Sequence, residues 1–350
     1  MLWIATLLLF TCTDDRAEAI ELLRAGRQRA AADILSRLLD EQPVNPELRS
    51  ELVRVEMRIG RYASALQHAE SLGPAFDATR GKALYLLGRY DEALVFLKSD
   101  DSESILFRHE SLRVLARFEE AGEALKQAAK LLGEDHIEVR VRRGQAFARE
   151  GKLEEAVAQF RPALERDPLS AAAMFGLGRA LLDLDKPDEA IAVLERHRAL
   201  TPLLDGLDFA RRNLQLDLSH APNHAALGDA FRVLVPLDPR LVQEARNSYA
   251  SAAKLAETDE VAPIALRHAR LFEENLGDPA QAVHVLDEAF AQLADARLAV
   301  RAGDVWMRAG KPRAAQLQFE RAQALRPNDK AIAERIRLAH AAQNKESTPR

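Results

Sequence analysis

The chain has 350 residues, of which 47% are hydrophobic and 29% are charged, as is usual for globular proteins. Its 49 basic and 54 acidic residues leave a net charge of −5 and form no long block of one sign, which argues against a nucleic-acid-binding surface. The single cysteine excludes an intramolecular disulfide and any zinc site built from several cysteines.

The chain opens on an uncharged apolar run, MLWIATLLLFTCT, which is followed directly by Asp14 and Asp15. A membrane-spanning helix needs about 20 apolar residues, so this run is too short to span a bilayer, but it suits the hydrophobic region of an export signal. Residues 9–12 (LFTC) resemble the lipobox of bacterial lipoproteins, in which the cysteine is lipidated. Thr11 replaces the usual smaller residue, and no Lys or Arg precedes the run. We therefore expect residues 1–12 to be a lipoprotein signal segment with Cys12 lipidated; another export signal and a buried first helix are the alternatives.

One phrase occurs twice in the chain. Residues 148–168 read AREGKLEEAVAQFRPALERDP, and residues 308–327 read RAGKPRAAQLQFERAQALRP. Counted from Gly151 or from Gly310, both place Ala, Phe, Ala and Pro at offsets of 5, 9, 12 and 17. Self-similarity at a fixed spacing indicates a solenoid of stacked structural repeats.

The same spacing recurs elsewhere in the chain. Five glycines are each followed five residues later by an alanine: Gly26, Gly60, Gly88, Gly151 and Gly310, with Ala31, Ala65, Ala93, Ala156 and Ala315. Glycine readily adopts the positive φ that often ends a helix. Prolines that cannot continue a helix come later in several repeats, at Pro43, Pro168, Pro202 and Pro327. The pattern resembles the tetratricopeptide repeat, a pair of antiparallel helices with a period of about 34 residues.

This resemblance implies an all-α fold, an α-solenoid in which helix pairs form a right-handed superhelix. We expect eight or nine repeats over residues 13–328. It also implies that small residues of the first helices lie where the second helices approach closely, at Gly81, Gly144, Gly178, Gly228 and Gly303.

The register is irregular in places. The turn positions Gly60, Gly88 and Ala116 are 28 residues apart, which predicts short second helices or tight links within residues 46–101. The region 205–240 is also irregular: residues 205–220 are expected to form one extra helix, and residues 234–239 a widened loop. Asn275 is predicted to be a one-residue insertion. We expect residues 329–343 to form an amphipathic capping helix with Ile332, Ile336 and Leu338 on its inner side, and residues 344–350 to be a disordered tail.

No catalytic motif is evident. The chain has no nucleophile elbow, no HExxH sequence and no phosphate-binding loop. His220 and His224 are four residues apart, but Pro222 between them interrupts the helix that would align them as metal ligands. We therefore expect neither an enzyme nor a cofactor, metal or small-molecule substrate.

In the repeats that this chain resembles, the first helices line a concave groove. The resemblance places ten residues there: Arg54, Met57, Lys82, Tyr85, Glu110, Arg113, Gln145, Phe175, Arg179 and Arg232. Arg and Tyr are common anchors at protein interfaces. The expected ligand of this groove is therefore a protein or peptide.

The leading hypothesis is a non-enzymatic scaffold for protein–protein interaction that is exported and anchored by lipidated Cys12 at a bacterial cell envelope. The alternatives are a cytoplasmic adaptor of the same fold and, less favoured, a docking array associated with an enzyme. The membrane is an expected partner only if Cys12 is modified.

Overall fold

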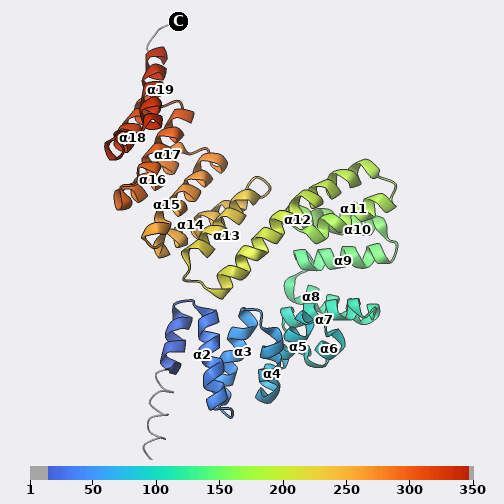
Figure 1. The fold of residues 1–350 in the computed structure, drawn as a ribbon. Coiled ribbons are helices and arrows are strands. Elements are labelled where there is room, and N and C mark those ends of the chain that lie inside the picture. The colour runs from blue at the N-terminus through green and yellow to red at the C-terminus, as the bar shows by residue number, and fades with distance from the viewer. Residues whose placement is uncertain (1–14, 347–350) are drawn as a thin grey trace, which may run out of the picture. The chain divides into compact units, whose positions relative to one another are not determined.

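The computed structural model describes residues 15–346, and all regular structure within them is helical (Figure 1). The helices pack in consecutive antiparallel pairs, so the fold is an all-α solenoid, as the sequence predicted. The chain divides into two compact units. Unit 1 runs to Asp205 and includes Gln215–Asp217, whereas unit 2 holds Gly206–Leu214 and the chain from Leu218 onward. The predicted signal segment, residues 1–12 with Cys12, lies outside the described residues.

Unit 1 begins with helical residues 15–24, which pair with the next helix. The helices that follow are α2 (Gln28–Glu41), α3 (Pro46–Arg58), α4 (Tyr62–Ala69), α5 (Asp77–Leu86), α6 (Tyr90–Phe96), α7 (Ser102–Val114), α8 (Phe118–Leu132), α9 (Ile137–Arg149), α10 (Leu153–Arg166) and α11 (Ala171–Asp183). The long helix α12 (Pro187–Leu216) contributes residues to both units. Short 3₁₀ turns at Glu70–Leu72 and Pro74–Phe76 join α4 to α5.

Unit 2 continues the pairing of helices. Its elements are α13 (Ala221–Leu234), a 3₁₀ turn η3 (Pro239–Leu241), α14 (Val242–Leu255), α15 (Thr258–Arg270), a π-helical turn η4 (Leu271–Asn275), α16 (Pro279–Leu293), α17 (Ala296–Arg308), α18 (Pro312–Leu325) and α19 (Lys330–Glu346). The widened loop after α13 is present where the sequence predicted it. The predicted insertion at Asn275 ends the π turn, the usual way in which a helix accommodates one extra residue.

The predicted turns and short helices are confirmed. All five turn glycines have a positive φ, as at Gly151 (75°) and Gly310 (68°). Ala116 takes the same conformation with a φ of 58°. In the region of 28-residue spacing, the second helices α4 and α6 have 8 and 7 residues, against 14 in α10.

The predicted close approaches between paired helices are also confirmed. A Cβ atom built on Gly144 would stand 2.6 Å from Cε1 of Phe160, and one on Gly228 would stand 2.8 Å from Cε1 of Tyr249. Gly178 and Gly303 are equally crowded by a side chain of the partner helix, and Gly81 by Leu97 directly after α6. The alanines of the second helices, Ala31, Ala65, Ala93, Ala156 and Ala315, are fully buried.

Two predictions about helix ends are wrong. Pro202 does not close a second helix, because it lies inside α12, which runs unbroken to Leu216. The extra helix expected over residues 205–220 is the second half of this same helix. Leu200 and Leu207, seven residues apart on one face, are buried on either side of the exposed Pro202, and this burial outweighs the local effect of proline.

The C-terminal helix also differs from expectation. Ile332 and Ile336 pack inward as predicted, but Leu338 is 53% exposed and Ala339 is buried instead. At 100° per residue, positions 332, 336 and 339 share one face of the helix, whereas 338 points away from it. The helix ends at Glu346, three residues into the predicted disordered tail, and residues 347–350 lie outside the described residues.

Candidate binding groove

A cleft opens in unit 1 where the first helices of three successive pairs, α3, α5 and α7, come together. Its cavity volume is about 410 Å³. The residues that line it are Arg54, Met57, Arg58, Ala78, Thr79, Lys82, Asp101, Glu103, Ser104 and Phe107. Three of the ten predicted groove residues, Arg54, Met57 and Lys82, therefore meet in one place.

The cationic side chains of this cleft differ in how they are held. Arg54 and Arg58 are exposed, and neither makes an ion pair with a described residue. Lys82 Nζ lies 2.5 Å from Glu103 Oε1 and 5.6 Å from the centre of the Phe107 ring. The two guanidinium groups are therefore the ones available to bind a carboxylate or a carbonyl oxygen of a partner.

Tyr85 adjoins the cleft through the Phe107 ring, and Glu110 and Arg113 lie near Tyr85. The centres of the Tyr85 and Phe107 rings are 4.6 Å apart. Burial raises the pKa of Tyr85, and the nearby negative charge of Glu110 raises it further. Burial also disfavours ionisation of Glu110, but hydrogen bonds from Arg113, including one of 2.9 Å from Nε, hold its carboxyl pKa below the ordinary value.

The other predicted residues lie apart from this cleft. Gln145 is on α9, and Phe175 and Arg179 are on α11, where Phe175 is 51% exposed. Arg232 lies in unit 2; its side chain is only 18% exposed and pairs with Glu274 at 2.8 Å. That all ten residues share one groove stays a prediction.

Some lining residues were missed by the sequence analysis. Arg58 lies four residues after Arg54, so the helical period places both on one face of α3 and could have revealed it. Asp101, Glu103 and Ser104 belong to the start of α7, where Asp101 caps the helix by accepting a 2.8 Å hydrogen bond from the Ser104 N–H. Predicting that these residues line the cleft requires the angle between successive helix pairs, which cannot be derived from the sequence pattern.

A family model agrees with the geometry of the helix pairs. The model of the tetratricopeptide repeat matches residues 16–77 and 141–204, which cover the first helix pairs of unit 1 and the pairs around α10 and α11. These two stretches of the chain are tetratricopeptide repeats. Among curated proteins no relative matches the sequence.

Several solved structures are similar to this chain at low sequence identity. A tetratricopeptide-repeat protein of Thermus thermophilus, TTC0263, is 17% identical over 59% of this chain and 100% of its own, with a TM-score of 0.33. The tetratricopeptide domain of P58(IPK) is 18% identical over 97% of this chain and 100% of its own, with a TM-score of 0.25. The Naa15/Naa10 complex bound to HypK contains a chain that is 17% identical over 93% of this chain and 56% of its own, with a TM-score of 0.37.

Tetratricopeptide arrays present extended surfaces that bind other proteins, so the chain is a scaffold for protein–protein interaction. Within residues 15–346, no group of three or more His, Cys, Asp or Glu side chains is placed to hold a metal ion. None of the helices in the same range combines the length and the apolar character needed to cross a bilayer.

Proposed function

We propose that this protein is a non-enzymatic scaffold that binds a segment of a protein partner in the cleft between α3, α5 and α7. The observation that carries the proposal is the combination of two exposed guanidinium groups without an ion-pair partner among the described residues, Arg54 and Arg58, with the apolar side chains of Met57 and Phe107 in one cavity of about 410 Å³. Arginine and aromatic side chains in a pocket are the usual centres of binding energy at protein interfaces.

The chemistry of the cleft favours a particular kind of partner segment. Arg54 and Arg58 need hydrogen-bond acceptors, preferably carboxylates, which pair with guanidinium groups in a bidentate manner. Met57 adapts to irregular apolar shapes, and Phe107 offers a flat apolar surface. A segment with an apolar side chain beside an acidic one satisfies both requirements.

Crosslinking can identify the partner, and affinity measurements with variants then test whether the partner binds in the cleft. A photoreactive amino acid at Thr79, inside the cleft, should trap the partner, and the same amino acid at Arg37 on α2 should not. The identified partner is then titrated against the wild type, the double variant Arg54→Glu/Arg58→Glu, and the control Arg37→Glu, which reverses an exposed charge outside the cleft. Reversal of two contact charges should weaken binding about tenfold or more without lowering the melting temperature. Equal affinity of all three proteins would rule out this cleft as the binding site.

We further propose that the scaffold is exported and held at a bacterial cell envelope by acyl chains on Cys12. The support is that the only cysteine of the chain ends its apolar N-terminal run. One acyl chain gives weak, reversible membrane binding, and two or more hold a protein stably.

The anchoring proposal has its own experiment. Expressed in a bacterial host with its native first residues, the protein should incorporate labelled fatty acid and fractionate with membranes, and Cys12→Ala should not. An unlabelled wild type that begins at Met1 would instead favour the cytoplasmic adaptor. Enzymatic activity in a complex with the trapped partner would favour a docking array associated with an enzyme.

A further inference from the structure

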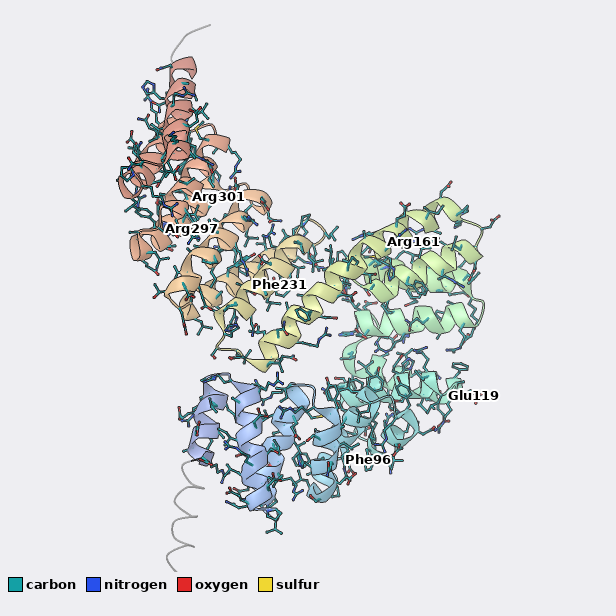
Figure 2. The ribbon with its side chains drawn as sticks, in the orientation of Figure 1. Phe96, Glu119, Arg161, Phe231, Arg297 and Arg301 are labelled. Carbon is teal, nitrogen blue, oxygen red and sulfur yellow. The ribbon has the colours of Figure 1, made fainter. Side chains whose placement is uncertain are left out.

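A cavity of about 240 Å³ lies in unit 2 between three successive helices, α14, α15 and α16 (Figure 1). Figure 2 shows the side chains of these helices in the same orientation. Two of the three, α14 and α16, are the second helices of their pairs, so the cavity is not part of the groove that the first helices are expected to line. The residues that line it are Ala250, Ala253, Val261, Ile264, Ala265, His268, Val285, Glu288, Ala289 and Gln292.

The floor of the cavity is apolar and closed. Ile264 and Ala265 of α15 and Ala289 of α16 are 3%, 6% and 4% exposed. The facing wall on α14 consists of two alanines, whose small side chains leave the space between α14 and α16 unfilled. An apolar cavity of about 150 Å³ holds one benzene molecule, so this one accommodates a single ring with a short substituent.

His268 is the polar group within this apolar lining. Its Nε2 atom is buried, and no described residue forms a hydrogen bond with it. Buried polar atoms in native proteins normally have a hydrogen-bond partner. Burial lowers the pKa of His268 to about 4, so at pH 7 the imidazole is neutral and has one nitrogen that donates and one that accepts. A hydroxyl group both donates and accepts, and it can therefore pair with either tautomer.

The charges around the cavity favour an uncharged molecule. No Lys or Arg is among the lining residues, so an anionic group would find no partner there. Glu288 is the one acidic residue of the lining; it is exposed, and its Oε1 atom lies 3.4 Å from Nε2 of His284. Exposed charges attract one another only weakly in water, so Glu288 gives a cation little advantage.

The surroundings of the cavity favour a free small molecule over a docked protein. Gln243 and Asn247 share one face of α14 with Ala250 and are exposed, as is His284 on α16. The apolar surface therefore ends at the rim of the cavity. The centre of a protein interface is a broader apolar area that excludes water.

We propose that this cavity binds a small uncharged molecule that has an apolar ring and one hydroxyl group, the chemistry of a substituted phenol. The ring rests on Ile264, Ala265 and Ala289, and the hydroxyl group pairs with the imidazole of His268. Because the molecule binds only the folded chain, it stabilises the packing of α14, α15 and α16. The site lies in a different unit from the cleft between α3, α5 and α7, and the inference does not depend on binding at that cleft.

The experiment uses the full chain at pH 7 and two probes of similar shape, 4-fluorophenol and fluorobenzene, which differ in the hydroxyl group. Fluorine NMR titrations measure the affinity of each probe for the wild type, His268→Phe, Ala253→Phe and the control Ala291→Phe. Ala253 is an exposed wall residue, so a phenyl group there fills the cavity without displacing a buried side chain. Ala291 is also exposed and lies on α16, but it does not line the cavity.

We expect 4-fluorophenol to bind the wild type and Ala291→Phe equally and to raise the melting temperature of both. Neither probe should bind Ala253→Phe. His268→Phe keeps an aromatic ring but loses the hydrogen bond, so it should bind 4-fluorophenol about three- to tenfold more weakly and fluorobenzene as well as the wild type does.

Melting temperatures of the free variants show whether each is folded, and the comparison of the two probes on the wild type tests the hydroxyl group even if His268→Phe is not. The proposal is overturned if neither probe binds the wild type at millimolar concentration, if Ala253→Phe and Ala291→Phe bind equally, or if the two probes bind the wild type equally. It is also overturned if N-acetyltyrosinamide binds more tightly than 4-fluorophenol and loses this binding in Ala253→Phe, because the occupant is then a tyrosine side chain of a partner protein.

Discussion

At the scale of single residues, the helix pairs are held together by a small residue beneath a large one. A Cβ atom on Gly303 would stand closer than 3.0 Å to the ring of Phe319, which is 1% exposed. Phe160 lies in the same way over Gly144 and Gly176, which belong to two different helices. These glycines lie within α-helices, so the lack of a side chain, and not a positive φ, makes them necessary.

Gly303→Ala should therefore destabilise the protein by about 1–3 kcal/mol, because the added methyl group forces the buried ring to shift. The matched control is Gly122→Ala in α8, where a Cβ atom meets no atom within 4 Å. That change should stabilise by about 0.5–1 kcal/mol, since glycine is a poor helix former. Urea unfolding followed by circular dichroism measures both changes. If both substitutions stabilise, the close packing at Gly303 is not present.

His268 in α15 is a second position where a single side chain matters, because its protonation changes the stability of the fold with pH. Its ring stacks on Tyr249 with the centres 5.3 Å apart and lies 5.1 Å from the centre of Phe272. Burial, assisted by the positive charge of Arg246, lowers the pKa of His268 to about 4. In the unfolded chain the ordinary pKa of about 6.5 applies. Between these two values the unfolded state binds more protons than the folded state, so stability falls as the pH falls.

We expect His268 to remove about 2 kcal/mol of stability between pH 7 and pH 5, as the linkage relation gives for these two pKa values. His268→Phe cannot take up a proton and keeps the aromatic packing, so its free energy of unfolding should fall less over the same range. Urea titrations at both pH values give the difference, in which the carboxylates common to the two proteins cancel. Parallel pH profiles would show that His268 binds a proton as readily in the folded state as in the unfolded state.

At the scale of helices, the sequence predicts the features that depend on a local, periodic spacing of residues. The turn glycines and the short helices α4 and α6 follow from spacing, and the small residues at the close approaches follow from the resemblance to the repeat family. The run of α12 through Pro202 does not, because buried side chains on both sides of the proline decide it. In the candidate groove, Arg54, Met57 and Lys82 could be predicted from the repeat register, whereas Phe107 depends on how successive pairs are angled.

The continuity of α12 can be tested at Pro202. A proline in a helix interior lacks a hydrogen-bond donor and crowds the preceding turn, at a cost of about 3 kcal/mol relative to alanine. Pro202 is exposed, so Pro202→Ala should raise the free energy of unfolding by up to this amount without disturbing packing. Pro327→Ala, outside any helix, should give no gain, because it only increases the freedom of the unfolded chain. Equal effects at both sites would mean that the helix breaks at Pro202.

At the scale of the whole molecule, each helix pair packs mainly on the pairs that precede and follow it in the chain. The stability of such an array is close to a sum of repeat and neighbour terms, so a defect in one repeat is felt mainly by its neighbours. The division into two units, each with its own internal packing, adds to this independence.

Hydrogen exchange of Gly303→Ala tests this independence. The substitution loosens the contact between α17 and α18, so amide exchange should become faster in α16 to α19, which share packed side chains with these helices. Exchange in α3 and α4 of unit 1 should stay at the wild-type rate, because local opening there does not involve Phe319. Mass spectrometry of peptic fragments resolves the two regions in one experiment. A uniform acceleration along the chain would instead mean that the protein opens as a single cooperative unit, and nearest-neighbour packing would then not describe its stability.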